Sequence, residues 1–333
     1  MIYRAYAPSD AVAVVAVWNA CIGDDFPLDM RLWAQNVDHC PWTYNAGCWL
    51  AVDDASNQAT AVVGFVIAKS PGNISAIAVL PEYRRRGIGR ELLRRSVVAL
   101  RSPEGRVRAA EKVFSGKPPA HLVTGQDMHH FFPGIPETQA EAFAFFAACG
   151  WTRAGNWGYD LWRDLDGFAI APNVQSRITL LSAKGVVLRG CSKADVPALI
   201  AFLEAEFPGG WLYGASRRLE VEPDATGTKI AVRDGAVIAF AQTFSPRSVR
   251  LGPSIAWREQ LGSQFAGLGP MGVAVDARGL GVGLALLAFC VAEAQRTGAT
   301  RMAIDWTEHL DFYARLGFAP WKRYGAFSLP LDD

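Results

Sequence analysis

The sequence lacks the patterns of metal-binding, disulfide-stabilised and membrane-spanning proteins. Its six cysteines form no C-x-x-C pair and its five histidines no His-x-x-x-His spacing, so we expect no bound metal and no disulfide framework. Reduced cysteines favour a cytoplasmic location. The chain begins without a basic segment leading into a long apolar run, and the apolar run from Ala11 to Trp18 is too short to span a bilayer. We therefore expect no membrane partner.

Neither sign of charge is in excess. The 333 residues include 33 Lys and Arg against 32 Asp and Glu, for a formal net charge of +1. Nucleic-acid-binding proteins generally carry a basic surface, so we expect no nucleic acid and take a small molecule as the partner. A composition that is 50% hydrophobic and 20% charged is typical of globular proteins, and the length suffices for two domains.

The familiar nucleotide-binding loops are also absent, but a different glycine loop is present from Arg278 to Gly283. A dinucleotide loop starting at Gly279 would need glycine at Leu284, and a P-loop would need Gly-Lys followed by Ser or Thr. The pattern present is Arg-x-x-Gly-x-Gly, between an apolar run and an alanine- and leucine-rich run. Such a strand–loop–helix presents backbone N–H groups to a phosphate or pyrophosphate.

The same pattern occurs in the first half of the chain, from Arg84 to Gly89. Arg278 follows Arg84 by 194 residues, and the glycines keep that separation. The pairs Arg4 with Asp10 and Arg189 with Asp195 repeat a further spacing, so the sequence indicates an internal duplication. We expect a first domain at residues 1–165 with an insertion at about 101–136, a linker at 166–184 and a second domain at 185–333.

Each half ends alike, with an aromatic-rich helix followed by Cys-Gly-Trp or Leu-Gly-Phe and then by a predicted strand. With both loops placed after a central strand, the chain resembles a tandem member of the GNAT superfamily of N-acetyltransferases, and the resemblance covers both halves. It implies an α/β (α+β) fold of two GNAT-type domains, each a mixed, mostly antiparallel central sheet flanked by helices.

The resemblance also implies acetyl-CoA as a cosubstrate, held by the glycine loops and the strand ends before them. The cofactor-binding positions it gives are Val273, Val275, Arg278, Gly279, Gly281 and Gly283 in the second half, and Val79, Arg84, Arg85, Arg86, Gly87, Gly89 and Arg90 in the first. The arginines that follow Arg90 on the first helix have a second interpretation as a solvated helix face.

Acetyl transfer to an amine needs a proton for the departing thiolate, and the resemblance assigns this role to Tyr313. The corresponding residue of the first half is Phe146, which has no hydroxyl, so the second half is the expected main catalytic unit. A base is also needed, because an alkyl ammonium has a pKa near roughly 10. Asp305, at the end of a predicted strand, is the first candidate, followed by Glu308, His309 and Glu206.

Several of these residues also have plain structural interpretations. Tyr313 could be a core residue, and Asp305 a helix-start carboxylate beside the cap Thr307. His129 and His130, in the insertion, could supply an acid to the first half or simply pack its loop. The segment from Phe207 to Trp211 could cover a substrate or form a plain turn.

We therefore expect an acetyl-CoA-dependent N-acetyltransferase, monomeric or homodimeric, that acts on a primary amine of a small polar molecule, with an amino sugar as the first acceptor to consider. Two alternatives remain open. One is an acyl-CoA-binding regulatory or scaffold protein without transferase activity, and the other is a protein-lysine acetyltransferase.

Overall fold

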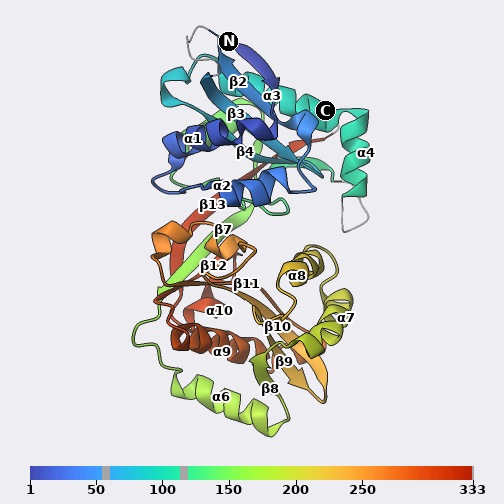
Figure 1. Ribbon diagram of the computed structural model, residues 1–333, viewed down its shortest axis with the longest axis vertical. Coiled ribbons are helices and arrows are strands. Elements are labelled where there is room, and N and C mark those ends of the chain that lie inside the picture. The colour runs from blue at the N-terminus through green and yellow to red at the C-terminus, as the bar shows by residue number, and fades with distance from the viewer. Residues whose placement is uncertain (55–60, 113–118, 332–333) are drawn as a thin grey trace. The chain divides into compact units, whose positions relative to one another are not determined.

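The computed structural model describes residues 1–54, 61–112 and 119–331, and divides into two compact units (Figure 1). The first unit comprises Met1–Gly158 together with Arg323–Asp333, and the second comprises Tyr159–Lys322. The sequence from Asp53 to Gln58 predicts the polar turn of a hairpin, and most of it lies outside the described residues.

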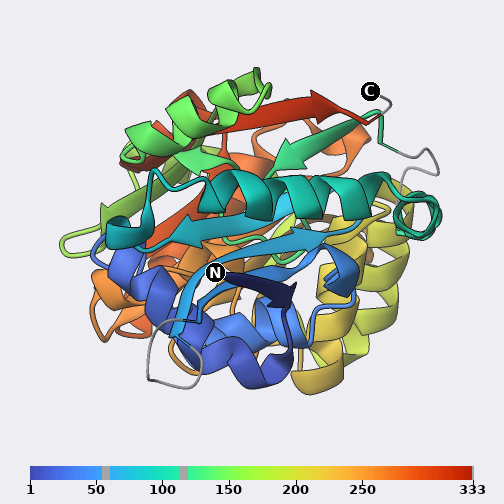
Figure 2. The same ribbon diagram turned by 90° about the horizontal axis from the view of Figure 1, so that it is seen from above.

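The first unit contains a mixed sheet in the order β1-β2-β3-β4-β5-β13, in which β6 also pairs with β13. All its neighbours are antiparallel except β4 and β5. Figure 2 shows α3 lying across the strands β2 to β4. The strands are β1 (Ile2–Ala5), β2 (Trp49–Asp53), β3 (Ala61–Lys69), β4 (Asn73–Val79), β5 (His121–Thr124), β6 (Ile135–Pro136) and β13 (Ala319–Pro330), and the α-helices are α1 (Ala11–Ile22), α2 (Met30–Trp33), α3 (Ile88–Arg101), α4 (Pro103–Glu111) and α5 (Ala140–Ala148).

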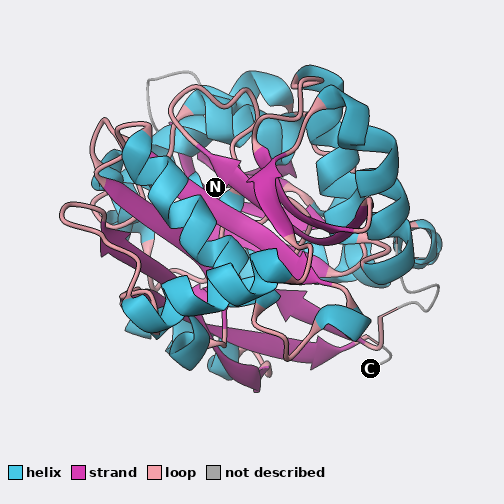
Figure 3. Ribbon diagram, turned by 90° about the horizontal axis from the view of Figure 1, so that it is seen from below, coloured by secondary structure: helices cyan, strands magenta, loops and turns pink. Residues whose placement is uncertain are grey.

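The second unit contains a sheet in the order β7-β12-β11-β10-β9-β8, and its neighbours are antiparallel except β11 and β12. Figure 3 shows helices, in cyan, lying across the strands. The strands are β7 (Thr152–Asp164), β8 (Val187–Gly190), β9 (Thr228–Arg233), β10 (Ala236–Phe244), β11 (Phe265–Val273) and β12 (Arg301–Thr307), and the α-helices are α6 (Pro172–Ala183), α7 (Val196–Glu206), α8 (Gly210–Val221), α9 (Val282–Arg296) and α10 (Leu310–Ala314).

The two units repeat one another in local detail as well as in strand order. Arg4 pairs with Asp10 at 2.7 Å, and Arg189 pairs with Asp195 at 2.6 Å. Both carboxylates also accept a main-chain N–H just before the short 3-10 turn that leads into α1 or α7. The expected fold, two domains with mixed and mostly antiparallel sheets flanked by helices, is confirmed.

The last strand of each half pairs with strands from the other half of the sequence. From Tyr159 on, strand β7 belongs to the second unit, where it pairs with β12. From Arg323 on, strand β13 belongs to the first unit, where it pairs with β5 and β6. The units therefore differ from the contiguous ranges 1–165 and 185–333, because the hydrogen-bond partner of a strand depends on tertiary structure and not on its place in the chain. Whether the two copies of the duplicated sequence extend over residues 1–165 and 185–333 remains a prediction.

The core of the second unit explains the composition of α9. Eight side chains of this helix, from Val282 to Val291, are buried, and they pack with strands β10 and β11 and with Val174 and Leu181 of α6. A helix with apolar residues on all sides is stable in water only when other elements cover it. This packing fixes both α9 and α6 relative to the glycine loop at the start of α9.

Candidate active site

Both glycine loops connect a strand to a helix, as the sequence predicts. The residue that precedes the helix has a left-handed backbone in each case, with φ of 89° at Gly281 and 83° at Gly87. Glycine adopts this conformation without strain, which explains its position in the motif. Two residues earlier the loops differ, because Gly279 has φ of 76° whereas Arg85 holds φ of 60° with a full side chain.

The first arginine of each motif makes the same hydrogen bond to the preceding strand. Nε of Arg278 donates to the carbonyl oxygen of Val273 at 3.1 Å, and Nε of Arg84 donates to that of Val79 at 3.0 Å. The shared bond ties the start of each loop to the strand before it. The duplication predicted from the sequence therefore extends to the internal geometry of the loops.

The charges around the two loops differ. In the first unit, Arg84 and Arg85 both pair with the carboxylate of Glu141 on α5, at 3.2 and 3.4 Å. Arg86 donates to the main chain of Glu82, and Arg90 to that of Ala148. In the second unit, no carboxylate of the described residues lies within ion-pair distance of Arg278. The first loop therefore has more arginines, two of which are engaged by Glu141, whereas Arg278 of the second loop has no ion-pair partner among the described residues.

The end of β11, just before the second loop, contacts α7 and the segment that follows α7. The main-chain N–H of Val275 donates to Oε2 of Glu206 at 2.9 Å, so this alternative base already binds the main chain. The ring of Phe207 occupies the position that a side chain at Gly272 would need. It also packs with Trp211 at 5.0 Å between ring centroids. The segment from Phe207 to Trp211 thus lies against β11.

Strands β11 and β12 separate at a defined point. Their parallel ladder runs from the pair Phe265 and Arg301 to the pair Leu268 and Ile304, while β11 continues to pair with β10 as far as Val273. In the first unit, the β4–β5 ladder ends in the same way after Ile74 and Thr124. The main chain of β11 beyond Leu268 is thus no longer joined to β12.

A β-bulge in β12 lies just beyond this separation. Strand β12 pairs with β7 through Ile304 and Leu161 and then through Thr307 and Tyr159, so Asp305 and Trp306 together lie opposite the single residue Asp160. The main-chain N–H of Trp306 donates to Oδ1 of Asp160 at 3.1 Å. Bulges of this kind re-aim side chains and are frequent beside active sites.

Trp306 has a strained backbone conformation at this bulge. Its φ is 32°, a left-handed value that costs a non-glycine residue on the order of 1–3 kcal/mol. Its side chain is 40% exposed, whereas tryptophan is highly buried on average. The bulge therefore presents an exposed tryptophan directly after Asp305 in the chain and opposite Asp160.

The carboxyl group of Asp305 faces the point where β11 leaves β12. Its Oδ1 would lie 2.8 Å from a Cβ placed on Gly269, which has φ of 135°, so only glycine fits there. Burial first, and the negative charge of Asp160 second, raise the pKa of Asp305 to about 7. Two neighbouring carboxyl groups cannot both ionise freely when they are removed from water. Asp305 can therefore gain and lose a proton near neutral pH.

Tyr313 is close enough to Asp305 to sense its charge. The tyrosine is 9% exposed, and its pKa is raised to about 12 by burial and by the negative charge of Asp305. It is therefore protonated at neutral pH and able to donate. The preceding residue, Phe312, lies near Gly283, so α10 packs at the start of α9.

The first unit lacks all three of these groups. Phe146, with 3% exposure, replaces the tyrosine. Gly125 follows the last pair of the β4–β5 ladder, Ile74 and Thr124, and so corresponds to Asp305. Val123 pairs with Ser328, so Gly125 lies opposite Ala326, which corresponds to Asp160. The first unit therefore has neither the carboxyl pair nor the hydroxyl.

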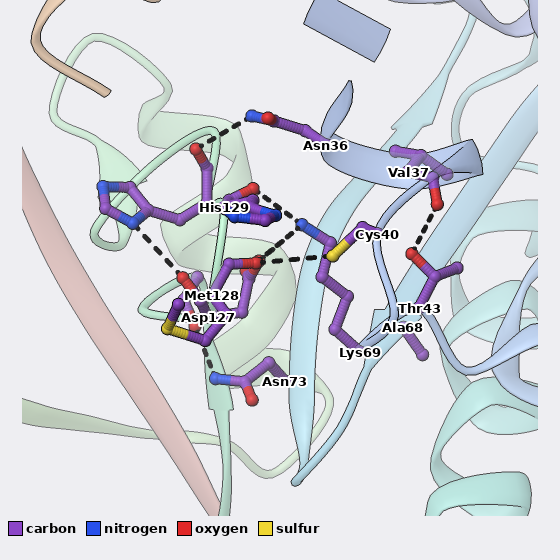
Figure 4. A network of polar contacts seen from close by, with 12 residues as sticks. Asn36, Val37, Cys40, Thr43, Ala68, Lys69, Asn73, Asp127, Met128 and His129 are labelled. Atoms are coloured by element: carbon purple, nitrogen blue, oxygen red, sulfur yellow. Dashed lines mark hydrogen bonds and ion pairs between the residues drawn. The ribbon is translucent and has the colours of Figure 1, made fainter. Parts of the chain in front are cut away.

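The insertion of the first unit is held by a buried polar network (Figure 4). Lys69 on β3 pairs with Asp127 at 2.6 Å, and both side chains are fully buried. Nζ of Lys69 also donates to the carbonyl oxygen of His129 at 2.8 Å, and Asn36 donates to that of His130. Burial lowers the pKa of His130. These contacts favour the interpretation of the two histidines as loop-packing residues.

The sequence alone did not single out Asp160, Trp306 or Arg177 of α6. Asp160 lies on a strand that we expected to complete the first domain, so it was not considered beside Asp305. Trp306 follows a candidate acid, but its exposure depends on the bulge. Arg177 was counted with the linker. Strand β7 also carries Arg153, Arg163 and Asp164, so the charge at position 160 gave no signal of its own.

The glycine loops, the parting strands and the terminal helices agree with a single family. The model of the acetyltransferase (GNAT) family matches residues 17–121 and, separately, residues 196–318, which together exceed half of the chain. The chain therefore belongs to the GNAT family of acetyltransferases, as a tandem member. No curated protein matches it by sequence.

Solved structures that match over nearly the whole of this chain support the fold. A GCN5-related glucosamine N-acetyltransferase region of a fungal multi-domain GH3 beta-N-acetylglucosaminidase has 24% identity and a TM-score of 0.83, over 98% of this chain and 38% of that chain. A GCN5-related N-acetyltransferase from Sphaerobacter thermophilus has 18% identity and a TM-score of 0.65, over 99% and 95%. A tandem GNAT protein from the clavulanic acid biosynthesis pathway has 18% identity and a TM-score of 0.61, over 100% and 99%.

These likenesses establish the fold, and the chain spans only 38% of the fungal protein. Within the described ranges, no group of three or more His, Cys, Asp or Glu side chains is placed to hold a metal ion. No helix in that part of the chain is long and apolar enough to cross a membrane. The six cysteines are free.

Proposed function

We propose that this acetyltransferase moves an acetyl group from acetyl-CoA to the primary amine of a small polar molecule, with an amino sugar as the acceptor, and that the second unit is the main catalytic unit. One observation carries the proposal. Asp305 faces the separation of β11 and β12, next to Asp160 and within electrostatic reach of Tyr313. The first unit has Gly125 and Phe146 instead of Asp305 and Tyr313.

The residues at the second glycine loop fit an acyl-CoA. The family uses acetyl-CoA, which supplies the acetyl group as a thioester. Left-handed glycines at positions 279 and 281 place no side chain of their own on the loop, and the terminal nitrogens of Arg278 have no carboxylate neighbour among the described residues. We assign Val273, Val275, Arg278, Gly279, Gly281 and Gly283 to this site.

The acid pair suits an amine that arrives as an ammonium ion. An ammonium near two carboxyl groups is stabilised by their charge, and it must lose a proton before it attacks a carbonyl carbon. Asp305, with a pKa of about 7, accepts that proton when ionised. Tyr313, which keeps its proton, donates it to the departing thiolate. Asp160 remains the neighbour that keeps the pKa of Asp305 high.

An exposed tryptophan beside these acids favours a ring-shaped acceptor. Trp306 offers an apolar face next to a polar edge, which matches the mixed surface of a sugar ring. The fungal structural neighbour is described as a glucosamine N-acetyltransferase region. Glucosamine is therefore the first acceptor to test.

The decisive experiment measures amine-dependent release of free CoA thiol from acetyl-CoA, with mass spectrometry of the product. Glucosamine, galactosamine, aminoglycosides and lysine peptides form the acceptor panel, and glucose and N-acetylglucosamine are controls without a free amine. A protein-only blank is required, because Cys21 and Cys149 are partly exposed thiols. Turnover with amino sugars supports the proposal.

Two other outcomes would contradict it. Turnover restricted to lysine peptides would indicate a protein-lysine acetyltransferase. Tight binding of acetyl-CoA without turnover on any amine would indicate an acyl-CoA-binding protein that has lost its transfer activity.

A further inference from the structure

Helix α6 carries an arginine to the second glycine loop from outside the loop motif. A Cβ placed on Gly281 would lie 2.8 Å from Cδ and 3.0 Å from Cγ of Arg177, so the aliphatic stem of this arginine lies directly over the loop. Its Nε would lie 3.2 Å from the same position. The segment was expected to be a linker, and besides packing on the second unit it brings a cation to a proposed phosphate site.

The position of α6 is fixed by its apolar face. Val174 and Leu181 are seven residues apart and therefore lie on the same face of the helix. They are 2% and 4% exposed and belong to the core that includes α9. Figure 1 shows α6 lying beside α9. Arg177 lies between these two residues on an exposed part of the helix. The backbone that carries Arg177 is therefore held in place, while its side chain remains accessible.

The guanidinium group of Arg177 has no hydrogen bond or ion pair within residues 1–54, 61–112 and 119–331. The contrast with the first loop is direct, since Arg84 and Arg85 there share the carboxylate of Glu141. In the second unit, Arg177 and Arg278 are two cations at one loop without such a carboxylate. Guanidinium groups bind phosphate oxygens through paired, charge-assisted hydrogen bonds.

We infer that Arg177 is a phosphate-binding residue for acyl-CoA, and that α6 thereby completes the cofactor site of the second unit. The inference rests on the proposed function, because it presumes that the second loop binds acyl-CoA. CoA offers two phosphate sources, the pyrophosphate and the 3′-phosphate, which share the same chemistry. Arg177 comes from α6 and not from the loop itself, so it adds a contact that the loop motif does not contain.

The test is direct calorimetric measurement of binding, without turnover, for the wild type, Arg177→Ala and Arg177→Lys. Loss of one charge-assisted contact should weaken CoA binding about tenfold in Arg177→Ala, with partial recovery in Arg177→Lys. Arg296→Ala is the matched control, because Arg296 is an exposed arginine at the opposite end of α9, paired with Glu293. It should leave binding unchanged.

A parallel titration with 3′-dephospho-CoA identifies the phosphate. If Arg177 binds the pyrophosphate, the alanine variant loses the same factor with both ligands, and if it binds the 3′-phosphate, the loss disappears with dephospho-CoA. CoA binding by Arg177→Ala that equals or exceeds wild-type affinity would overturn the inference, since the side chain would then be packing against the loop or blocking it. If the wild type itself does not bind CoA, both the proposed function and this inference are wrong.

Discussion

The main-chain N–H of Trp306 donates a 3.1 Å hydrogen bond to Oδ1 of Asp160, across the bulge where β12 faces β7. Asp160 belongs to the first half of the sequence, whereas Asp305 and Trp306 belong to the second. The carboxyl pair of the proposed site is therefore built from both copies of the duplicated sequence. Its properties should depend on Asp160 even though Asp305 is the group assigned to proton transfer.

Replacement of Asp160 should change the pH dependence of catalysis. Asp160→Asn removes a negative charge near Asp305 but keeps a side-chain oxygen for the N–H of Trp306. The pKa of Asp305, raised to about 7 by burial and by Asp160, should fall, so the ionised base persists to lower pH. The acidic limb of kcat/KM should move to lower pH, which raises the rate at about pH 6 relative to about pH 8.

Asp164→Asn is the control for this experiment, because Asp164 lies on the same strand but is exposed and paired with Arg301. Its pH profile should match that of the wild type. A profile for Asp160→Asn that keeps its wild-type inflection would show that Asp160 does not set the pKa of the base.

Much of this architecture could be predicted from the sequence, because local patterns determine local structure. The cap from Ser192 to Asp195 followed by an apolar run predicts a helix from Val196 to Glu206, and α7 has these bounds. Both glycine loops join a strand to a helix, as predicted. The pairing of β7 with β12, and of β13 with β5 and β6, could not be predicted in the same way. A final strand has the same alternating pattern whichever sheet it completes, so the sequence does not reveal its partner.

The site shows the same division between local and tertiary information. Tyr313 and Asp305 follow recognisable local features, a helix before Leu-Gly-Phe and the end of a strand. Asp160 becomes part of the site through the β7–β12 pairing, and Arg177 through the packing of α6 on α9. Both contributions depend on contacts between residues far apart in the sequence.

Asp305→Asn should remove the base while keeping the shape of the site. General acid–base catalysis typically contributes about 10²- to 10⁴-fold, so kcat should fall by a factor in that range. Acetyl-CoA affinity, measured by calorimetry, should stay unchanged because Asp305 is assigned to proton transfer and not to the cofactor site. Glu308→Gln is the matched control, and a larger loss in that variant would reassign the base to Glu308.

Tyr313→Phe should lower kcat with little effect on acetyl-CoA affinity. The hydroxyl is the group that donates a proton to the thiolate, and the ring itself, which packs with Phe312 and Phe318, remains in place. The variant should lose roughly 10- to 100-fold in kcat, less than a full acid–base contribution, because water can protonate a thiolate in part. Tyr3→Phe, in the first unit, is the control, and unchanged turnover in Tyr313→Phe would remove this hydroxyl from the mechanism.

Bulky residues at the two loop glycines should have unequal effects on CoA stoichiometry. A β-branched residue is strained at the left-handed φ of either Gly281 or Gly87, and at Gly281 it would also collide with Arg177. We expect Gly281→Val to abolish acetyl-CoA binding and Gly87→Val to leave it intact, because Glu141 already pairs with the arginines of the first loop. Loss of half of the bound acetyl-CoA in each variant would show instead that both loops are filled.

The buried pair of Lys69 and Asp127 should be important for stability and not for chemistry. Lys69→Met leaves the carboxylate of Asp127 buried without its partner, which should reduce the free energy of unfolding of the first unit by about 3–5 kcal/mol. Urea unfolding followed by tryptophan fluorescence measures this change. Arg94→Ala, which removes an exposed pair with Glu91, is the control and should change stability little.

The double variant Lys69→Met with Asp127→Leu tests whether the loss comes from the uncompensated charge. Removing both charges avoids burying a lone carboxylate, so the double variant should be more stable than Lys69→Met alone. The main-chain oxygens of Met128 and His129 would still lose the ammonium donor, so recovery should be incomplete. Turnover per folded molecule should remain at the wild-type level in both variants, because the proposed catalytic groups lie in the second unit. A fall in kcat that exceeds the fall in folded protein would show that the insertion of the first unit takes part in the reaction.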